Sequence, residues 1–338
     1  MRAFVITAPG RGEVQEVATP RATPGSVVVA VERVGVCGTD AEFFGGEMAY
    51  LATGEASYPM RIGHEWCGRV IEVGEGVSED WLGRRVTADT MLGCGSCRRC
   101  TSGRQHLCED RFEIGVRRGF PGALAERIAV PAKALVTLGE IDALAGAMVE
   151  PGGNALRSVR GAKVKPGDSM LVIGAGAIGL LVAQIARAKG ADVHLLGRSA
   201  RSLDFARTLG FTQSTTLEDL DRSIPFDSVV DASNAPGSPA LATELVEPGG
   251  RIVLVGLSGT PSLIDTRTVA LADVTAVGVL SASGGLEETV ELYASGAVDP
   301  RPLVAATVGL GRVAAVLAGQ RPEGAGAGPK IHVDPTLL

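Results

Sequence analysis

The densest group of potentially reactive residues is a run of four cysteines, Cys94, Cys97, Cys100 and Cys108. Four thiolates at this spacing close a tetrahedral zinc site and leave no position for a substrate, so residues 94–108 are predicted to form a structural zinc lobe. An iron–sulfur cluster also takes four cysteines, but nothing else in the sequence suggests a redox partner for one. Such crowding is a poor arrangement for disulfides in a reducing compartment.

A second candidate metal site draws on residues that lie far apart in the chain. Cys37 stands in VGVCGTD, His64 in RIGHEWCG and Glu150 in MVEPGG. Taken singly, a buried cysteine or a lone histidine is more often a packing residue than a ligand. Together, one thiolate, one imidazole and one carboxylate suit a catalytic zinc that keeps a coordination position open. The sequence therefore predicts two zinc ions per chain.

The segment GAGAIG has the glycine spacing of a dinucleotide-binding turn. Gly174, Gly176 and Gly179 follow the apolar run MLVI, and Ala177 and Ile178 begin a helical pattern. Glycine allows the tight turn, the approach of the backbone to a pyrophosphate, and the close packing of helix on strand. The helix N-terminus adds N–H donors and a partial positive charge. A purely structural glycine-rich turn is the alternative.

The end of the next strand-like run, DVHLL, bears on the choice of cofactor. A carboxylate is expected there if the ribose 2′-hydroxyl of NAD is bound, but this chain has Gly197, followed by Arg198, Ser199 and Arg201. Two cations and a hydroxyl suit a 2′-phosphate, and a charge-assisted contact contributes roughly 1.5–3 kcal/mol. The sequence favours NADP, with NAD as the alternative if the arginines are only solvated surface residues.

These residues need two kinds of scaffold, and a chain of 338 residues is long enough for two domains. Up to residue 152, short apolar runs such as RVIEV are broken by Gly, Pro and Asp, which is typical of a mostly-β domain. From 153 to 286, apolar strands alternate with amphipathic helices, which predicts a doubly wound parallel sheet, the Rossmann type of α/β fold. Beyond 286 the alternation fades.

Composition argues against several classes of partner. The net charge is −6 and there is no long basic run, so nucleic acid is not an expected partner. The start, MRAFVITAPG, lacks the long apolar core of a signal peptide or membrane anchor. We therefore expect a cytoplasmic protein that has no membrane partner.

Taken in order, these motifs resemble those of the zinc-dependent medium-chain dehydrogenases/reductases, which include alcohol, polyol, threonine and glucose dehydrogenases. The resemblance spans the Cys-Gly-Thr-Asp, Gly-His-Glu and Glu-Pro motifs, the four-cysteine lobe, the glycine-rich turn and the closing KIHVDP. It implies a GroES-like catalytic domain at 1–152, a Rossmann domain at 153–286, and a return of residues 287–338 to the catalytic domain.

The resemblance also assigns roles at the catalytic metal. It implies that Cys37, His64 and Glu150 are the zinc ligands, and Glu-Pro at this point favours the polyol, threonine and sugar dehydrogenase branch. Glu65 matches an acidic residue that orients a zinc water or transiently ligates the metal. Asp40 is expected to fix the Cys37 loop.

The mechanism that the resemblance implies uses the charge on zinc. Zinc lowers the pKa of a bound alcohol, and the resulting zinc-bound alkoxide expels hydride to the nicotinamide. Thr39 matches the position that relays the alcohol proton outward. Many members have histidine three residues later, where this chain has Glu42, a carboxylate that suits a polyol hydroxyl. That departure leaves the relay beyond Thr39 open.

The expected function is hydride transfer between NADP(H) and a secondary alcohol, polyol, sugar or cyclitol. The alternatives are an NADPH-dependent ketone or aldehyde reductase and a dinucleotide-binding protein without catalysis, although every ligand position is filled. The segment 47–59 is expected to line the substrate entrance, while Trp66 and Phe120 are either pocket walls or packing residues. Cys67 matches no ligand position and is interpreted as a packing residue. The resemblance further implies a homodimer or homotetramer.

Overall fold

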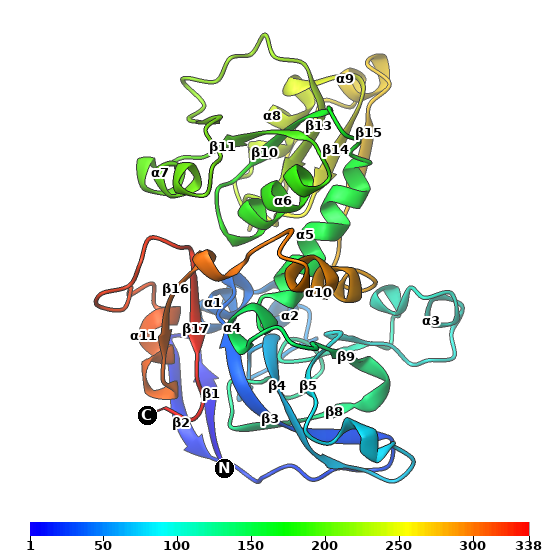
Figure 1. Ribbon diagram of the computed structural model, residues 1–338, viewed down its shortest axis with the longest axis vertical. Coiled ribbons are helices and arrows are strands. Elements are labelled where there is room, and N and C mark those ends of the chain that lie inside the picture. Colours follow the sequence, from blue (N-terminus) through cyan, green and yellow to red (C-terminus); the bar gives the residue numbers. More distant parts are fainter. Residues whose placement is uncertain (338) are drawn as a thin grey trace.

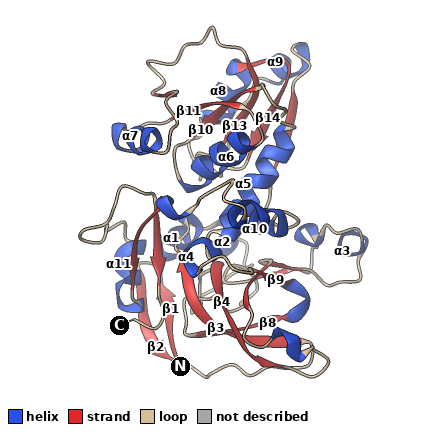
Figure 2. Cartoon of the chain, viewed as in Figure 1, coloured by secondary structure: helices blue, strands red, loops and turns tan. Residues whose placement is uncertain are grey.

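The computed structural model describes residues 1–337 and contains two differently built halves, joined by the long helix α5 (Val149–Ala162) (Figure 1). The upper half in the figure is an α/β layer structure, and the lower half is mostly strands (Figure 2). The C-terminal segment, drawn in red, runs back into the lower half. Among residues 1–337, no helix combines the length and apolar composition needed to cross a bilayer.

The upper half is built on a six-stranded parallel sheet in the order β12-β11-β10-β13-β14-β15. The first strand of this sheet in the sequence, β10, lies in the middle. β11 and β12 are added on one side of it, and β13, β14 and β15 on the other. The strand order therefore reverses between β10 and β13, and open α/β sheets bind ligands at such a point. The predicted doubly wound sheet is confirmed. Its strands are β10 (Ser169–Ile173), β11 (Asp192–Leu196), β12 (Ser214–Thr215), β13 (Phe226–Asp231), β14 (Val246–Leu254) and β15 (Thr275–Gly278). Its helices are α6 (Ala177–Ala188), α7 (Ala200–Thr208), α8 (Ser238–Leu245) and α9 (Thr266–Leu271).

The lower half contains a seven-stranded sheet in the order β16-β17-β3-β4-β5-β9, with β8 also paired to β3. The C-terminal strand β17 pairs antiparallel with β3, His332 lying opposite Gly35, so the last part of the chain completes a sheet begun near the first. The strands are β3 (Ser26–Gly35), β4 (Glu65–Val73), β5 (Arg85–Ala88), β8 (Arg127–Pro131), β9 (Leu135–Thr137), β16 (Val304–Val308) and β17 (Lys330–Val333).

Smaller elements surround this sheet. Two hairpin-like pairs, β1 with β2 and β6 with β7, form separate two-stranded sheets. They comprise β1 (Arg2–Ala8), β2 (Arg11–Glu16), β6 (Met91–Leu92) and β7 (Phe112–Glu113). The helices are α1 (Gly38–Gly45), α2 (Ala49–Ala52), α3 (Arg98–Thr101), α4 (Ala143–Gly146), α10 (Leu286–Ala294) and α11 (Val313–Leu317). Single 3₁₀ turns occur at η1 (Glu79–Trp81), η2 (Gln105–Leu107), η3 (Ala132–Ala134), η4 (Arg301–Leu303) and η5 (Leu310–Arg312).

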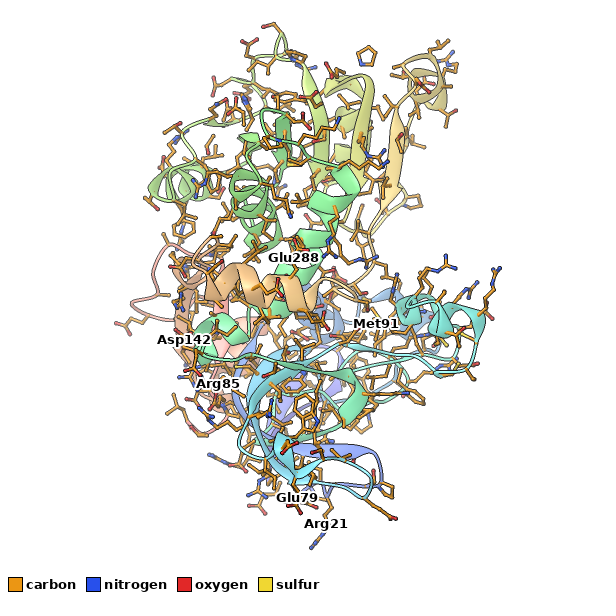
Figure 3. The ribbon with its side chains drawn as sticks, turned by 45° about the vertical axis from the view of Figure 1, so that its right-hand side comes forward. Arg21, Glu79, Arg85, Met91, Asp142 and Glu288 are labelled. Atoms are coloured by element: carbon orange, nitrogen blue, oxygen red, sulfur yellow. The ribbon has the colours of Figure 1, made fainter. Side chains whose placement is uncertain are left out.

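Helix α10 is tied to the helices of the upper half through Glu288, which is labelled in Figure 3. Its carboxylate accepts hydrogen bonds from Arg160 on α5 and, at 3.0 Å, from Lys189 just after α6. Apolar packing also connects the two halves. One buried cluster contains Leu138 and Met148 together with Leu180 of α6. The two halves therefore share a continuous core where α5 joins them.

The observed elements follow the sequence pattern closely, with one informative difference. The predicted change of domain at residue 152 falls inside α5, whose 14 residues run unbroken from one half toward the other. Helix α5 has an amphipathic pattern and buries ten residues, so packing against both halves favours a continuous helix over a loop there. The division into 1–152, 153–286 and 287–338 stays a prediction.

Candidate active site and metal centres

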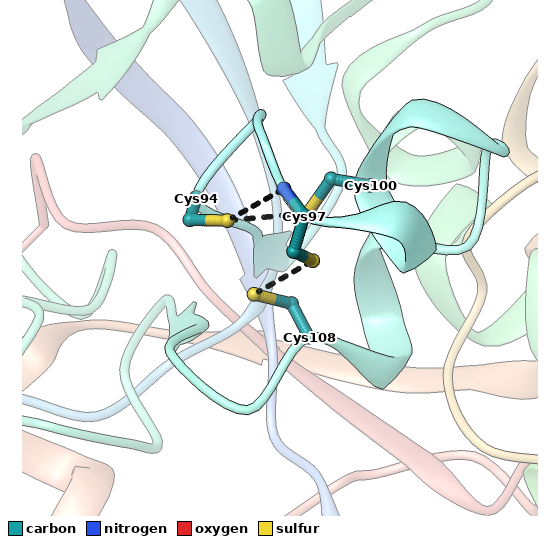
Figure 4. A group of neighbouring side chains, drawn as sticks. All are labelled: Cys94, Cys97, Cys100 and Cys108. Atoms are coloured by element: carbon teal, nitrogen blue, oxygen red, sulfur yellow. Dashed lines mark hydrogen bonds between the residues drawn. The ribbon is translucent and has the colours of Figure 1, made fainter.

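The four cysteines of the predicted lobe converge (Figure 4). One ligand sulfur from each of Cys94, Cys97, Cys100 and Cys108 lies within 4.8 Å of the others. The Sγ atoms of Cys94 and Cys100 are 3.9 Å apart, and those of Cys97 and Cys108 are 3.8 Å apart. No cysteine in residues 1–337 forms a disulfide. The short helix α3 begins directly after Cys97 and carries Cys100 to the same point in space.

The local chemistry of the lobe suits a metal ion. The backbone N–H groups of Cys97 and Ser96 lower the pKa of the Cys94 thiol to about 6, and Cys97 N lies 3.4 Å from Cys94 Sγ. Desolvation raises the pKa of Cys100 to about 12. A Cβ added at Gly93 would lie 2.6 Å from Cys100 Sγ, so glycine makes room for the sulfur. Four converging sulfurs fit a closed tetrahedral site.

The second candidate centre is buried at the start of helix α1, where Cys37 is the N-cap residue. Asp40 Oδ2 accepts a hydrogen bond from Cys37 N at 2.9 Å, and Asp40 Oδ1 accepts one from Gly63 N at 3.3 Å. The same oxygen lies 3.5 Å from His64 Nδ1. Burial is the largest single influence on His64 and lowers its pKa, but the charges and hydrogen bonds of Asp40 and Cys37 together outweigh burial and raise that pKa well above its usual value. The expected role of Asp40 in fixing the Cys37 loop is confirmed.

Glu65 is the carboxylate that forms a tight group of possible metal-ligand atoms with Cys37 and His64. One ligand atom from each of Cys37, His64 and Glu65 lies within 4.8 Å of the other two. Both Glu65 oxygens, however, accept hydrogen bonds from Lys330 Nζ, at 2.8 and 2.7 Å, and both side chains are buried. Although burial lowers it, the charge of Glu65 raises the pKa of Lys330 above its usual value. The ion pair holds the Glu65 carboxylate toward β17.

The ion pair depends on a glycine in the strand between its partners. Glu65 begins β4, Lys330 begins β17, and Gly35 at the end of β3 lies between them. A Cβ at Gly35 would collide with Glu65 Oε2. Sequence reasoning missed both Lys330 and Gly35 as site residues. The one available signal for the first was a lysine opening the otherwise buried run KIHV.

Glu150 lies in the first turn of α5 and is also buried. Burial raises its pKa to about 7, the charge of His64 opposes that rise, and the charge of Glu65 adds to it. Within the part of the chain that the structure describes, its carboxylate accepts one hydrogen bond, from Asn154 Nδ2 at 3.0 Å. It lies outside the tight group of Cys37, His64 and Glu65. A bound cation would stabilise a buried carboxylate that accepts so few hydrogen bonds.

Two further predicted residues lie on α1, one turn apart. Thr39 and Glu42 are both partly buried, and Thr39 directly precedes Asp40. Desolvation, and then the negative charge of Glu47, raise the pKa of Glu42 above its ordinary value. The carbonyl of Glu42 accepts from Glu47 N at 2.9 Å, at the end of the helix. The helix therefore places both side chains beside the Cys37 loop.

Of the residues that were candidates for either packing or a pocket wall, some lie in the core and one lies at the surface. Cys67 is fully buried with Sγ 3.2 Å from the Ala143 carbonyl, as expected of a packing residue. Trp66 is fully buried in the core of the lower half, which makes it a packing residue and not a pocket wall. Phe120 lines a surface cavity with Ser57 and Pro59, next to the β1–β2 hairpin. That cavity is the place where the segment 47–59 meets Phe120.

The glycine-rich turn has the expected form between β10 and α6. Gly174 adopts a φ of 108°, and its N–H donates to the Leu196 carbonyl at 2.7 Å. A Cβ at Gly179 would collide with the Gly174 carbonyl, so the helix needs glycine to approach the turn. A Cβ at Gly176, the N-cap, would meet nothing within 4 Å. Gly176 thus leaves the helix N-terminus open to a ligand, with Ala177 and Ile178 opening the helix.

The end of β11 places the predicted cations on the surface. Gly197 is buried, and a Cβ there would lie 2.8 Å from Leu203 Cδ2. Arg198 and Arg201 are exposed. Ser199 caps helix α7, because its Oγ accepts from Ser202 N at 3.2 Å. That hydroxyl is therefore already engaged in the helix cap, and the two arginines carry the local positive charge.

Comparisons with known proteins place these features in a family. Residues 23–140 match the alcohol dehydrogenase GroES-like domain, and residues 177–295 match the zinc-binding dehydrogenase domain. An L-threonine 3-dehydrogenase of Streptomyces avermitilis is 31% identical over 338 residues, covering 95% of each chain. Among solved structures, an NADP-bound zinc-binding dehydrogenase of Sinorhizobium meliloti 1021 is 28% identical with a TM-score of 0.89, over 99% of both chains. An alcohol dehydrogenase of Escherichia coli CFT073 complexed with NADH is 25% identical with a TM-score of 0.90, again over 99% of both.

The matched domains coincide with the two halves that the fold displays. The GroES-like match lies in the strand-rich lower half, which holds both cysteine centres, and the zinc-binding dehydrogenase match begins at the first residue of α6, directly after the glycine-rich turn. The chain therefore belongs to the zinc-dependent medium-chain dehydrogenases/reductases and is an oxidoreductase of that family.

Proposed function

We propose that this protein transfers a hydride between NADP(H) and a secondary alcohol, polyol, sugar or cyclitol. The observation that carries the proposal is the partly buried Cys37 beside the buried His64, together with the buried Glu150, in a chain that also has an open glycine-rich turn at a helix N-terminus. The similarity to an L-threonine 3-dehydrogenase supports a substrate with a secondary hydroxyl. Reduction of a ketone or aldehyde by NADPH would use the same residues in reverse.

In this proposal Cys37, His64 and Glu150 hold the catalytic zinc. The donor set fits, because a ligand atom of His64 lies within 4.8 Å of one of Cys37, and Glu150 is a buried carboxylate with a raised pKa and one hydrogen bond in the described chain. When bound, zinc would supply Lewis acidity that lowers the pKa of the substrate hydroxyl, and the nicotinamide would accept the hydride. Asp40 would fix the Cys37 backbone and orient the His64 ring.

Glu65 has a supporting role. Its carboxylate is held by Lys330, so it would act as a charged neighbour of the metal and not as a permanent ligand. Thr39 would accept the proton of the substrate hydroxyl and pass it outward, and Glu42 would bind a second substrate hydroxyl from the same helix face. Cys94, Cys97, Cys100 and Cys108 would hold a second, structural zinc.

NADP is the proposed cofactor because of the charge at the end of β11. Arg198 and Arg201 are exposed there, where a ribose-binding carboxylate is expected for NAD. Gly174, Gly176 and Gly179 would accept the pyrophosphate at the start of α6, and Gly197 would let the ribose approach the strand end. With Ser199 engaged in capping α7, discrimination against NAD would come from the arginines.

We further propose that two copies associate through β15, the edge strand of the parallel sheet. Strand β15 has one unpaired edge, and the neighbouring Leu263 and Leu271 are 87% and 90% exposed. Large exposed apolar side chains next to an unpaired strand edge are typical of an interface. A Leu271→Glu variant should therefore run as a monomer in light-scattering chromatography, while the wild type runs as a dimer or tetramer.

The function is tested by a spectrophotometric assay of zinc-replete protein with NADP⁺ against a panel of secondary alcohols, polyols and sugars. NADPH formation that is lost in a Cys37→Ser variant of unchanged melting temperature supports the proposal. Activity of equal size in that variant would contradict it. Titration of nicotinamide fluorescence with NADPH and NADH, in wild type and in Arg198→Ala, tests the cofactor choice. Equal affinity for both cofactors in the wild type would argue for NAD.

A further inference from the structure

The loop between α11 and β17, residues 318–329, lies below helix α7 in both Figure 1 and Figure 3. This loop belongs to the C-terminal segment of the lower half, whereas Arg198 follows the end of β11 and Arg201 lies in the first turn of α7. Arg321 stands near the start of the loop. We propose that Arg321 is a third cation for the 2′-phosphate of NADP, an inference that rests on the cofactor proposed above.

The Arg321 side chain is held in place by its own loop. Its Nη2 donates to the Gly328 carbonyl at 2.8 Å and also to the Gly326 carbonyl. Gly326 N in turn donates to the Ala305 carbonyl at 2.9 Å, which attaches the loop to β16. A Cβ at Gly328 would collide with the Leu303 carbonyl, so the loop packs closely against its own half. A guanidinium anchored in this way needs little further ordering to bind an anion.

The charges around Arg321 are uncompensated. Within residues 1–337, none of Arg198, Arg201 and Arg321 forms an ion pair. By contrast, Arg207, which lies on α7 with Arg201, pairs with Asp204 at 2.6 Å. Desolvation, and then the positive charge of Arg201, lower the pKa of Arg321, so the two guanidiniums lie within electrostatic range of each other. Like charges brought together without a counter-ion repel, and a phosphate dianion would remove that repulsion.

The arrangement divides the phosphate site between the two halves. Arg198 and Arg201 come from the parallel-sheet half, and Arg321 comes from the half that holds Cys37 and His64. A 2′-phosphate bound by all three would hold the two halves against each other. NADP would thus be selected by contacts on both sides of its adenosine ribose, and NAD would lack the group that connects them. In this arrangement Arg321 is a specificity-determining residue that the sequence does not reveal.

The test is isothermal titration calorimetry of full-length, zinc-replete protein with 2′,5′-ADP, which carries one phosphate at each position, and with 5′-AMP, which differs from it only in lacking the 2′-phosphate. Wild type should prefer 2′,5′-ADP by tenfold or more (on the order of one charge-assisted contact or greater). Arg321→Gln keeps donors for the loop carbonyls but removes the charge. It should lower the affinity for 2′,5′-ADP about tenfold and leave the affinity for 5′-AMP unchanged. Arg312→Gln, an exposed arginine of the same segment, is the matched control and should alter neither affinity.

Each alternative outcome is distinct. If wild type prefers 2′,5′-ADP and Arg198→Ala removes that preference, but Arg321→Gln does not change it, the NADP proposal stands and the role of Arg321 is wrong. An equal loss of affinity for both ligands in Arg321→Gln would mean a contact with the adenosine or the 5′-phosphate that they share, and would also overturn the inference. No preference in the wild type would overturn the NADP proposal and the inference with it. Arg321→Lys, which keeps the charge, should retain most of the preference.

Discussion

The two cysteine centres of this protein are assembled in opposite ways. The lobe takes all its sulfurs from residues 94–108, where one cysteine is exposed, two are partly buried and one is buried, and its geometry follows from short turns and one helical turn. The buried centre brings together Cys37, His64 and Glu65, with Glu150 outside that tight group, and it is completed by Lys330 near the end of the chain. A local centre can form before the fold is complete, whereas the buried centre exists only in the finished tertiary structure.

The same difference separates what the centres can do. Four thiols of one kind suit a metal that only holds a loop, because they fill every coordination position. The buried centre mixes a thiol, an imidazole and carboxylates with a cation. Neighbouring charges raise the pKa values of His64 and Lys330 although burial lowers both, and burial raises the pKa of Glu150. Mixed, mutually perturbed groups in a buried position are typical of catalysis.

The largest effect is expected from Cys37→Ser in the buried centre. Loss of a ligand should remove one zinc and lower kcat/KM by at least about a thousandfold, since several kcal/mol of transition-state stabilisation depend on the metal. The unfolding midpoint should change little by comparison. Steady-state kinetics and a thermal melt on the same preparation measure both quantities, and a stability loss without an activity loss would reverse the proposed roles.

Cys97→Ser in the lobe should give the opposite pattern. Loss of the metal unties residues 94–108, and we expect a loss of about 4 kcal/mol in the free energy of unfolding. The protein that remains folded should keep kcat/KM within about tenfold of wild type, because the lobe has no open coordination position. Urea unfolding together with an assay at low temperature tests this. A thousandfold loss of activity in well-folded Cys97→Ser would contradict the division of labour.

Lys330→Met probes the connection between the buried centre and the end of the chain. It leaves the Glu65 carboxylate buried without its partner, which should cost about 3 kcal/mol of unfolding free energy, the lower end of the usual range because the proposed zinc would also stabilise the carboxylate. The double variant Lys330→Met/Glu65→Gln should recover a large part of this loss, as no charge is then left unpaired. Denaturant titrations of the two variants give the comparison. Additive losses would mean that the pair is not coupled.

Asp40→Asn should weaken the centre without dismantling it. The amide keeps an acceptor for Cys37 N but loses the charge that acts on His64. Zinc affinity should fall by about tenfold, as is usual when a partner of a metal ligand is changed. Competition with a chromophoric chelator measures the affinity. An unchanged affinity would show that Asp40 only supports the backbone of α1.

Cys67→Ala is the control thiol and should have the smallest effect. Cys67 is buried against Ala143 and lies in neither centre, so its truncation should cost about 1 kcal/mol of stability and no zinc. Metal analysis and a melting curve are sufficient. Loss of a zinc ion from this variant would mean that Cys67 belongs to the buried centre after all.

The contrast between the centres also explains how far the sequence could be read. The spacing of Cys94, Cys97 and Cys100 is a local pattern, so the residues that converge in the lobe were predictable. The alternation of strands and helices after residue 153 is equally local, so the parallel sheet was predictable as well. Gly174 and Gly179 have the close approaches that their spacing indicates. In each case the pattern and the structure lie within one short segment.

Contacts between distant segments could not be predicted in this way. Nothing near Glu65 in the sequence indicates that its carboxylate reaches across Gly35 to Lys330, because the pairing of β3 with β4 and β17 exists only in the folded sheet. The placement of Arg321 near Arg201 depends in the same way on how the two halves meet. Even Ser199, a residue singled out for cofactor binding, proves to cap its own helix, a competing use of a hydroxyl that the motif does not reveal.

Native mass spectrometry counts the zinc ions bound to each chain. It therefore tests whether one chain holds two zinc ions in centres of different kinds. We expect two zinc ions in wild type, one in Cys37→Ser and one in Cys97→Ser. Activity should be lost only in Cys37→Ser. A wild type that holds a single zinc, or a Cys37→Ser variant that retains two, would contradict it.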